Sequence, residues 1–241
     1  MPKINDNLIL ICGESNTGKS ACLRDIPKPE EVLYLNCEAS KKLPFNSKFK
    51  EFVITNPLQV YEGFTYAETL PECHTIVIDS LTFLMEMYES TKVLTSDNTM
   101  SAWQDYQQFF KNLMQQYVAC STKNVIFTAH TVTIYDEAKM AMSISIPVKG
   151  ALRQVGLESY FSCIVGTSKH SIDELDNYKS DLLTINEEEE ILGFKYVFQT
   201  KLTKETVNSR IRSPMGMWNT KETFIDNSIQ NVLDRLHSFY K

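Results

Sequence analysis

The stretch GESNTGKS occupies residues 13–20 and directly follows LILIC, an apolar run at residues 8–12. A buried strand that leads into a glycine-rich loop ending in Lys-Ser matches the pattern G-x-x-x-x-G-K-[ST], whose backbone N–H groups surround the phosphates of a nucleotide. Glycine is needed at both ends of this loop because a side chain would block the approach of the backbone to the phosphates. The stretch predicts a phosphate-binding loop between a strand and a helix, which we expect over residues 20–25.

Two side chains of the loop have expected chemical roles. The Lys19 ammonium is expected to bridge the β- and γ-phosphates of the nucleotide, and the Ser20 hydroxyl is expected to be a ligand of Mg²⁺. The predicted cofactor-binding residues are Gly13, Glu14, Ser15, Asn16, Thr17, Gly18, Lys19, Ser20 and Ala21.

Short apolar runs recur along the chain, and helical patterns lie between some of them. One helical pattern starts at Ser101, which forms a capping-box pattern with Gln104, and a last helix opens near Asp226. This alternation predicts an α/β fold, a doubly wound and mostly parallel sheet with a C-terminal β-hairpin or strand extension and a terminal helix. A length of 241 residues suits one such domain over residues 1–241, and the predicted strands lie at residues 8–12, 32–35, 52–54, 76–78, 125–127 and 164–165.

A different pattern occupies residues 131–148. Apolar and polar side chains alternate there in two short runs, which the polar segment DEAK at residues 136–139 separates. Such alternation predicts a β-hairpin, or a mobile loop with strand tendency, that emerges from the strand end where ligands bind in open α/β sheets. The alternative is a simple hairpin that closes the edge of the sheet.

Acidic residues follow two of the predicted strands. Asp79 in TIVIDS is expected to hold Mg²⁺, directly or through water, from the end of a neighbouring strand. Many ATP-driven motors place a glutamate directly after this aspartate to activate the attacking water, but here the residue is Ser80. Glu38 in VLYLNCEAS is the alternative candidate for the base, since ligand groups gather at the strand ends of such sheets. Its other interpretation is a surface glutamate in a loop.

The charge balance limits the partners of the chain. A net charge of −6 argues against broad attraction to a nucleic-acid backbone, although basic residues gather locally. The N-terminal apolar run is too short for a signal peptide, and the scattered cysteines are expected to be reduced core thiols, so we expect a cytoplasmic protein. The local basic residues, which either contact phosphates or form a solvated strand edge, are Lys195, Lys201, Lys204, Arg210 and Arg212.

The order of these pieces resembles one group of proteins. GESNTGKS, YLNCEAS, VIDSLT and VIFTAHT together resemble the compact RecA-like ATPases of bacteriophages, the Sak-four group of single-strand annealing and recombination ATPases. The resemblance extends over most of the chain, including IPVKGALRQVGLESYF and YVFQTKLTKETVNSRIRSP. The phosphate-binding loop alone indicates only nucleotide binding, whereas the order of all the pieces points to this group.

The resemblance implies roles for named residues. Lys19, Ser20 and Asp79 would bind ATP with Mg²⁺, Glu38 would be the catalytic base and His130 a polar sensor. Residues 91–100 and 131–147 would be loops that face single-stranded DNA. A ring or filament of identical subunits is implied, acting in the cytoplasm (that of the host if the protein is phage-encoded), and a single-strand DNA-binding protein is a further candidate partner. Basic residues that would reach the γ-phosphate of a neighbouring subunit are Lys201, Arg210 and Arg212.

Two features depart from the pattern of that group. Position 130 holds histidine where the larger recombinases have glutamine. The expected DNA-facing loops contain only two basic residues, Lys92 and Lys139, and acidic residues lie beside them. We therefore expect one subunit alone to bind DNA weakly.

Two other functions fit a phosphate-binding loop in a chain of this size. A nucleotide or small-molecule kinase usually needs an arginine-bearing lid over the phosphates, and Arg153 is the nearest candidate. A non-catalytic module gated by ATP would bind nucleotide without turning it over.

Overall fold

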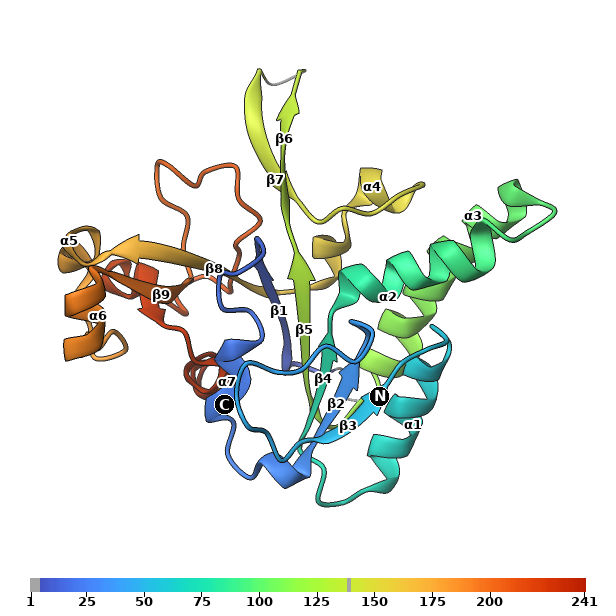
Figure 1. Ribbon diagram of the computed structural model, residues 1–241, viewed down its shortest axis with the longest axis horizontal. Helices are drawn as coiled ribbons and strands as arrows, with labels where there is room; N and C mark the ends of the chain where they lie inside the picture. The colour runs from blue at the N-terminus through green and yellow to red at the C-terminus, as the bar shows by residue number, and fades with distance from the viewer. Residues whose placement is uncertain (1–4, 138–139) are drawn as a thin grey trace.

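The structure, a computed structural model, describes residues 5–137 and 140–241. Within these residues, eight strands form one sheet in the order β10-β9-β8-β1-β5-β4-β2-β3 (Figure 1). The strands are β1 (Leu8–Gly13), β2 (Val32–Asn36), β3 (Lys50–Val53), β4 (Thr75–Asp79), β5 (Asn124–His130), β8 (Cys163–Ser171), β9 (Phe194–Gln199) and β10 (Phe224–Asp226).

Most of this sheet is parallel. Six neighbouring strands run in one direction: β3, β2, β4, β5, β1 and β8. Beyond β8, β9 runs antiparallel to β8, and β10 runs antiparallel to β9. The fold predicted from the sequence, a mostly parallel α/β sheet with a C-terminal strand extension and a terminal helix, is confirmed.

Both faces of the sheet are covered by apolar side chains, as the alternation of side chains along a strand requires. Leu10 and Ile78 belong to the core on one face, whereas Ile9 and Val77 belong to the core on the other. The first core is closed by α1 (Gln59–Thr69), α2 (Leu81–Tyr88) and α3 (Thr99–Asn112), and the second by α7 (Ile229–Phe239) (Figure 1). The short helices are α4 (Leu152–Val155), α5 (Ile172–Leu175) and α6 (Glu187–Leu192).

The helix expected after the phosphate-binding loop is shorter than an ordinary α-helix. The chain forms only a 3₁₀ helix, Ala21–Asp25, and becomes extended at Ile26. Pro27 and Pro29 follow, and a proline disfavours helical backbone in the residue before it. The prediction of a helix at residues 20–25 is therefore right in place but wrong in type.

Two predicted helix starts are also displaced. Helix α3 begins at Thr99, because the side chain of Asn98 accepts a hydrogen bond from the Ser101 N–H at 3.2 Å and so caps the helix. The expected capping box of Ser101 and Gln104 is wrong. Helix α7 begins at Ile229, because Asp226 still belongs to β10.

The predicted β-hairpin is present as β6 (Val132–Asp136) and β7 (Ala141–Ser145). These strands pair only with each other among the described residues and rise beyond the carboxyl ends of the large sheet (Figure 1). The alternative of a hairpin that closes the sheet edge is wrong. Lys139, the basic residue expected in this one of the two DNA-facing segments, lies outside the described residues.

Cys120 is exposed, unlike the other five cysteines, which are buried as expected of core thiols. In the part of the chain that the structure describes, no helix has both the length and the apolar character needed to span a bilayer.

The cap of α3 gives a first test of the structure. Asn98→Ala should lower the free energy of unfolding by about 1 kcal/mol, because an N–H at the start of the helix loses its acceptor. Gln104→Ala, the matched control at an exposed position of the same helix, should change that free energy by less than about 0.5 kcal/mol. Urea denaturation followed by circular dichroism measures both, and a larger effect of Gln104→Ala would contradict the assignment of the cap.

Candidate nucleotide-binding site

The predicted site residues meet because they follow neighbouring parallel strands. Gly13, at the end of β1, pairs with His130 at the end of β5, and Asn36, at the end of β2, pairs with Asp79 at the end of β4. Side chains that follow the carboxyl ends of parallel strands gather at one edge of a sheet. The structure therefore brings together groups that are far apart in the sequence.

The phosphate-binding loop turns tightly after β1. Asn16 and Gly18 have positive φ angles of 61° and 94°. A Cβ atom on Gly13 would lie 2.0 Å from Thr167 Oγ1, which shows why the loop needs glycine there. Thr17 Oγ1 lies 2.6 Å from Thr167 Oγ1, and this contact fastens the loop to β8.

Lys19 lies under the loop with its side chain largely buried. Its Nζ atom donates hydrogen bonds to the Gly13 carbonyl at 3.0 Å and to the Glu14 carbonyl at 2.6 Å. Burial lowers the pKa of Lys19, while the nearby carboxylates of Asp79 and Glu38 oppose this effect. The ammonium is thus the cationic group closest to the loop backbone, where the phosphates of a nucleotide would lie.

Asp79 is buried and accepts hydrogen bonds from three hydroxyl groups. Ser20 Oγ and Tyr34 Oη donate to Oδ2 at 2.9 and 2.8 Å, and Thr128 Oγ1 donates to Oδ1. Ser20 and Asp79 are the pair expected at Mg²⁺, and both offer oxygen atoms, the ligands that Mg²⁺ prefers. One carboxylate and one hydroxyl fit an ion that also binds substrate phosphates and water. The described residues contain no cluster of three or more histidine, cysteine or acidic side chains that would hold a metal alone.

Glu38 is buried and hydrogen-bonded through both carboxylate oxygens. Its Oε1 accepts from His130 Nε2 at 3.1 Å, and its Oε2 accepts from Lys41 Nζ at 2.7 Å. Burial raises the pKa of this carboxyl, but the hydrogen bonds from His130 and Lys41 and the charge of Lys41 outweigh it, so the pKa falls to about 2. Glu38 is therefore ionised at neutral pH.

Asn36 positions the backbone around Glu38. Its Oδ1 accepts from the Glu38 N–H at 3.0 Å, and its Nδ2 donates to the Lys41 carbonyl at 3.0 Å and to Glu51 Oε1 at 2.7 Å. These contacts hold the turn after β2 so that the Glu38 side chain reaches His130. The interpretation of Glu38 as a surface glutamate is wrong.

A cavity of about 380 Å³ connects these groups, a volume that suits a small ligand. Lys19, Ser20, Glu38 and His130 all line it. A second cavity of about 430 Å³ lies on the other side of the loop. The predicted cofactor-binding residues divide between them: Ser15, Asn16, Gly18, Lys19, Ser20 and Ala21 line the first, and Gly13, Glu14, Ser15, Asn16 and Thr17 line the second.

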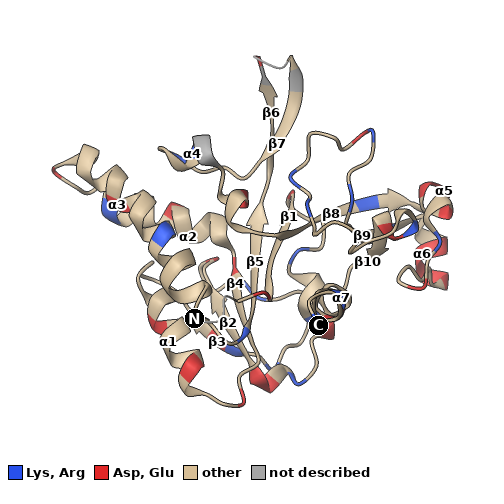
Figure 2. Ribbon diagram, turned by 180° about the vertical axis from the view of Figure 1, so that it is seen from behind, with Lys and Arg blue, Asp and Glu red and all other residues tan. Residues whose placement is uncertain are grey.

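Of the five basic residues that gather near the C-terminus, Arg210 lines the second cavity beside the phosphate-binding loop, and none is among the described residues that line the first. Lys195 is buried and forms ion pairs with Glu189 at 2.6 Å and Asp226 at 3.2 Å, so it has a structural role. Figure 2 shows other Lys and Arg positions along the long loop between β9 and β10. Three basic residues are candidates for contact with the γ-phosphate of a neighbouring subunit: Lys201, Arg210 and Arg212. None of them is among the described residues that line the first cavity.

Each of these three has a different environment. Lys201 Nζ donates to the Trp218 carbonyl at 3.3 Å, and Arg210 Nε donates to the Ile144 carbonyl at 2.9 Å. Arg212 is exposed, and its backbone pairs with Ile164.

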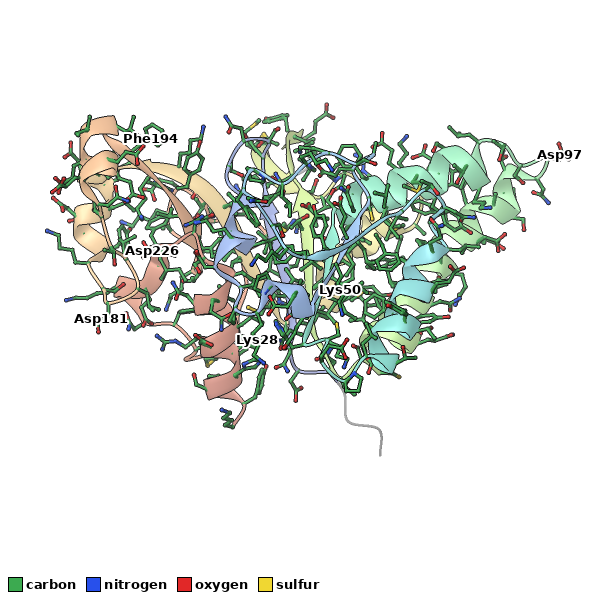
Figure 3. All side chains as sticks on the ribbon, turned by 60° about the horizontal axis from the view of Figure 1, so that its bottom comes forward. Lys28, Lys50, Asp97, Asp181, Phe194 and Asp226 are labelled. Atoms are coloured by element: carbon green, nitrogen blue, oxygen red, sulfur yellow. The ribbon has the colours of Figure 1, made fainter. Side chains whose placement is uncertain are left out.

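The two expected DNA-facing segments form separate projections. The hairpin β6–β7 rises from the sheet, whereas residues 91–100 form the tip of the α2–α3 pair (Figure 1), and Asp97 marks that extremity in Figure 3. Lys92 at this tip is exposed.

Several contacts of the site could not be expected from sequence motifs. Tyr34 and Thr128 donate hydrogen bonds to Asp79 from within apolar strands. A polar residue in an apolar strand is the only sequence feature that indicates such a contact. Lys41, which contacts Glu38, follows it by three residues in a turn that contains no recognisable motif. Asn227, which also lines the first cavity, precedes α7 without any motif.

Comparison with known proteins identifies a family. A family model described as "AAA domain" matches residues 5–191, more than half of the chain. No curated protein matches the sequence. The matched range contains the phosphate-binding loop, Glu38, Asp79 and His130.

The low pKa of Glu38 predicts a loss of stability in acid. Its pKa in the folded protein, about 2, lies below the ordinary value of 4.5, so its stabilising contribution is complete above about pH 4.5 and is lost as the pH falls toward 2. The difference in free energy of unfolding between wild type and Glu38→Gln should shrink over this interval. Urea denaturation at a series of pH values measures it, with Glu62→Gln at an exposed position of α1 as the control. A constant difference would show that Glu38 lacks these contacts.

Proposed function

We propose that this chain, which belongs to the AAA domain family, is an Mg²⁺-dependent ATPase that hydrolyses ATP to ADP and phosphate. A single observation carries the proposal. Lys19, Ser20 and Glu38 line one cavity, and Asp79 contacts this group through Ser20. A phosphate-binding group, a metal-binding pair and an ionised carboxylate at one sheet edge are the parts that phosphoryl transfer to water requires.

Each part has a proposed role in the reaction. Lys19 neutralises negative charge on the β- and γ-phosphates, and the phosphate-binding loop directs its N–H groups at them. Ser20 and Asp79 hold Mg²⁺, which supplies charge neutralisation at the phosphate oxygens. Glu38 orients the attacking water, and His130, which contacts Glu38, acts as the polar sensor of the γ-phosphate.

Of the two other functions, a kinase usually needs an arginine-bearing lid above the phosphates. Arg153 lies in α4 and is exposed, and it lines a cavity at the base of the hairpin together with Ile134 and Ser145. It is not among the described residues that line the cavity of Lys19 and Glu38. Water is therefore the acceptor that we propose.

The first functional test separates binding from turnover. Lys19→Ala should weaken ATP binding by roughly a hundredfold or more, because the charged donor to the phosphates is lost. Glu38→Gln should keep ATP affinity but lower kcat by about a hundredfold or more, because water loses its acceptor. Titration calorimetry measures the binding and phosphate release measures the turnover.

Lys28→Ala, at an exposed lysine that pairs with Glu31, is the control for both variants and should resemble wild type. Normal binding by Lys19→Ala would remove the basis of the proposed function. Normal turnover by Glu38→Gln would place the base elsewhere, and a labelled product other than phosphate would indicate a kinase.

We further propose that the ATPase acts on single-stranded DNA in phage-type recombination or replication, as the resemblance to the Sak-four group implies. The projecting hairpin supports this proposal, because it presents exposed apolar and aromatic side chains on which bases can stack. Tyr135 is 58% exposed and Met142 is 53% exposed. The described part of the hairpin contains no lysine or arginine, so stacking rather than charge would provide the contact.

The weak DNA binding that we expect of one subunit favours an assembly. The chain has a net charge of −6, and useful affinity for DNA would then require several hairpins on one strand. An oligomer of single-domain subunits supplies these copies. It would also place Lys201, Arg210 or Arg212 of one subunit beside the ATP of the next, where a cation stabilises charge that develops on the γ-phosphate.

Mixed assemblies test this arrangement. Hydrolysis per subunit should rise with protein concentration and should rise further with single-stranded DNA. A Lys19→Ala subunit should still assist an active neighbour, whereas a subunit with Arg210→Ala and Arg212→Ala should not, because it lacks the residues proposed to act across the interface. Phosphate release from mixtures with wild type measures the difference.

Lys204→Ala, which removes an exposed basic residue from the same loop, is the matched control. Turnover that is independent of concentration, with both mixtures behaving as simple dilutions, would show that the site is complete within one chain.

A further inference from the structure

Asn227 is a buried polar residue with unpaired hydrogen-bonding groups. It follows β10, precedes α7 and is 3% exposed. Neither its Oδ1 nor its Nδ2 atom has a hydrogen-bond partner among the described residues. A buried carboxamide normally has partners, because an unpaired donor or acceptor in the interior is costly. Its place in the fold therefore needs an explanation.

The carboxamide of Asn227 lies directly against the phosphate-binding loop. A Cβ atom on Gly18 would lie 3.2 Å from Asn227 Oδ1 and 3.3 Å from Asn227 Nδ2. Gly18 has a φ angle of 94°, so the loop backbone passes closely over the amide in a conformation that glycine adopts. Asn227 also lines the cavity that contains Lys19 and Glu38. The polar groups nearest to the unpaired amide therefore include the backbone of this loop.

The core holds Asn227 in this place. Ile229 and Val232 of α7 pack in one cluster with Cys22 and Leu23 of the 3₁₀ helix that follows the loop. The segment that carries Asn227 is thus fastened to the far end of the phosphate-binding loop by apolar contacts. Because the amide lies against the backbone at Gly18, a change in the conformation of the loop can supply the partners that it lacks.

We propose that Asn227 is a positioning residue of the phosphate-binding loop. Its carboxamide hydrogen-bonds with the loop backbone in the conformation that holds the nucleotide phosphates, so that ATP binding pairs the groups that are otherwise unpaired. This inference rests on the proposed binding of ATP. It adds to the site a residue that lies beyond the range matched by the family model, residues 5–191.

The proposal predicts opposite effects on the free and the ATP-bound protein. In the free protein, Asn227→Ala removes an unpaired amide, so the melting temperature should stay the same or rise. In the bound protein the variant loses the hydrogen bonds, so the Kd for ATP with Mg²⁺ should rise about tenfold. The KM for ATP should rise by a similar factor with kcat within about twofold of wild type, because the residue holds the loop and does not contact the reacting atoms.

Thermal unfolding with and without ATP and Mg²⁺, together with titration calorimetry, measures these effects. Asn227→Asp keeps the shape but loses the donor and adds negative charge beside the phosphates, so it should bind more weakly than Asn227→Ala. Asn227→Ser keeps a small hydroxyl and should recover part of the affinity. Asn231→Ala, in the first turns of the helix that follows Asn227, is the matched control and should bind as wild type does.

Two results would overturn the proposal. A wild-type Kd in Asn227→Ala and Asn227→Asp would show that the amide does not serve the loop. A large fall in the melting temperature of both free variants, with an unchanged shift on adding ATP, would show a purely structural residue. Absence of ATP binding by the wild-type protein would instead contradict the proposed function, and the two failures are therefore distinguishable.

Discussion

The arrangement of the site depends on one buried carboxylate, that of Asp79. A buried charge is tolerated only with well-placed partners, and here three hydroxyl groups supply them. The donors come from the phosphate-binding loop (Ser20), from β2 (Tyr34) and from β5 (Thr128), so one anion fixes three segments relative to β4. Loss of any donor would leave part of this charge uncompensated. The same contacts that stabilise the anion thus set the geometry of Ser20 and Asp79, the pair that we propose to hold Mg²⁺.

The fold also brings segments from both ends of the chain to the site. Strands β1, β5, β4 and β2 place the catalytic candidates at their carboxyl ends, while α7 packs behind the loop on the opposite face from α1 and α2. The 3₁₀ helix Ala21–Asp25 is too short to support the loop alone. Apolar contacts with Ile229 and Val232 complete this support, which makes the C-terminal segment part of the site and not an appendage.

The sequence predicted those parts of the site that follow apolar runs. The loop at residues 13–20, Glu38 and Asp79 each lie at the carboxyl end of a strand or just beyond it, so the topology alone brings them to one edge. Contacts between side chains were not predictable in this way. Glu38 and His130 are 92 residues apart, and only the strand order brings them within 3.1 Å. The start of α3 depends on the capping side chain of Asn98, and the short form of the helix after the loop depends on the two prolines that follow it. The periodicity of apolar residues detects neither effect.

The electrostatics of Glu38 indicate how such a residue can serve as the proposed base. A carboxylate whose pKa is about 2 is a weak proton acceptor, since His130 and Lys41 already stabilise its charge. Transfer of a γ-phosphoryl group to water proceeds through a loose transition state in most analyses, in which the water needs orientation more than early loss of a proton. A fixed and fully ionised carboxylate suits that task. Both of its oxygens are engaged, so water can approach only if it shares an oxygen with His130 or Lys41. In the proposed reaction the attacking water would therefore share Glu38 with two side chains that line the same cavity.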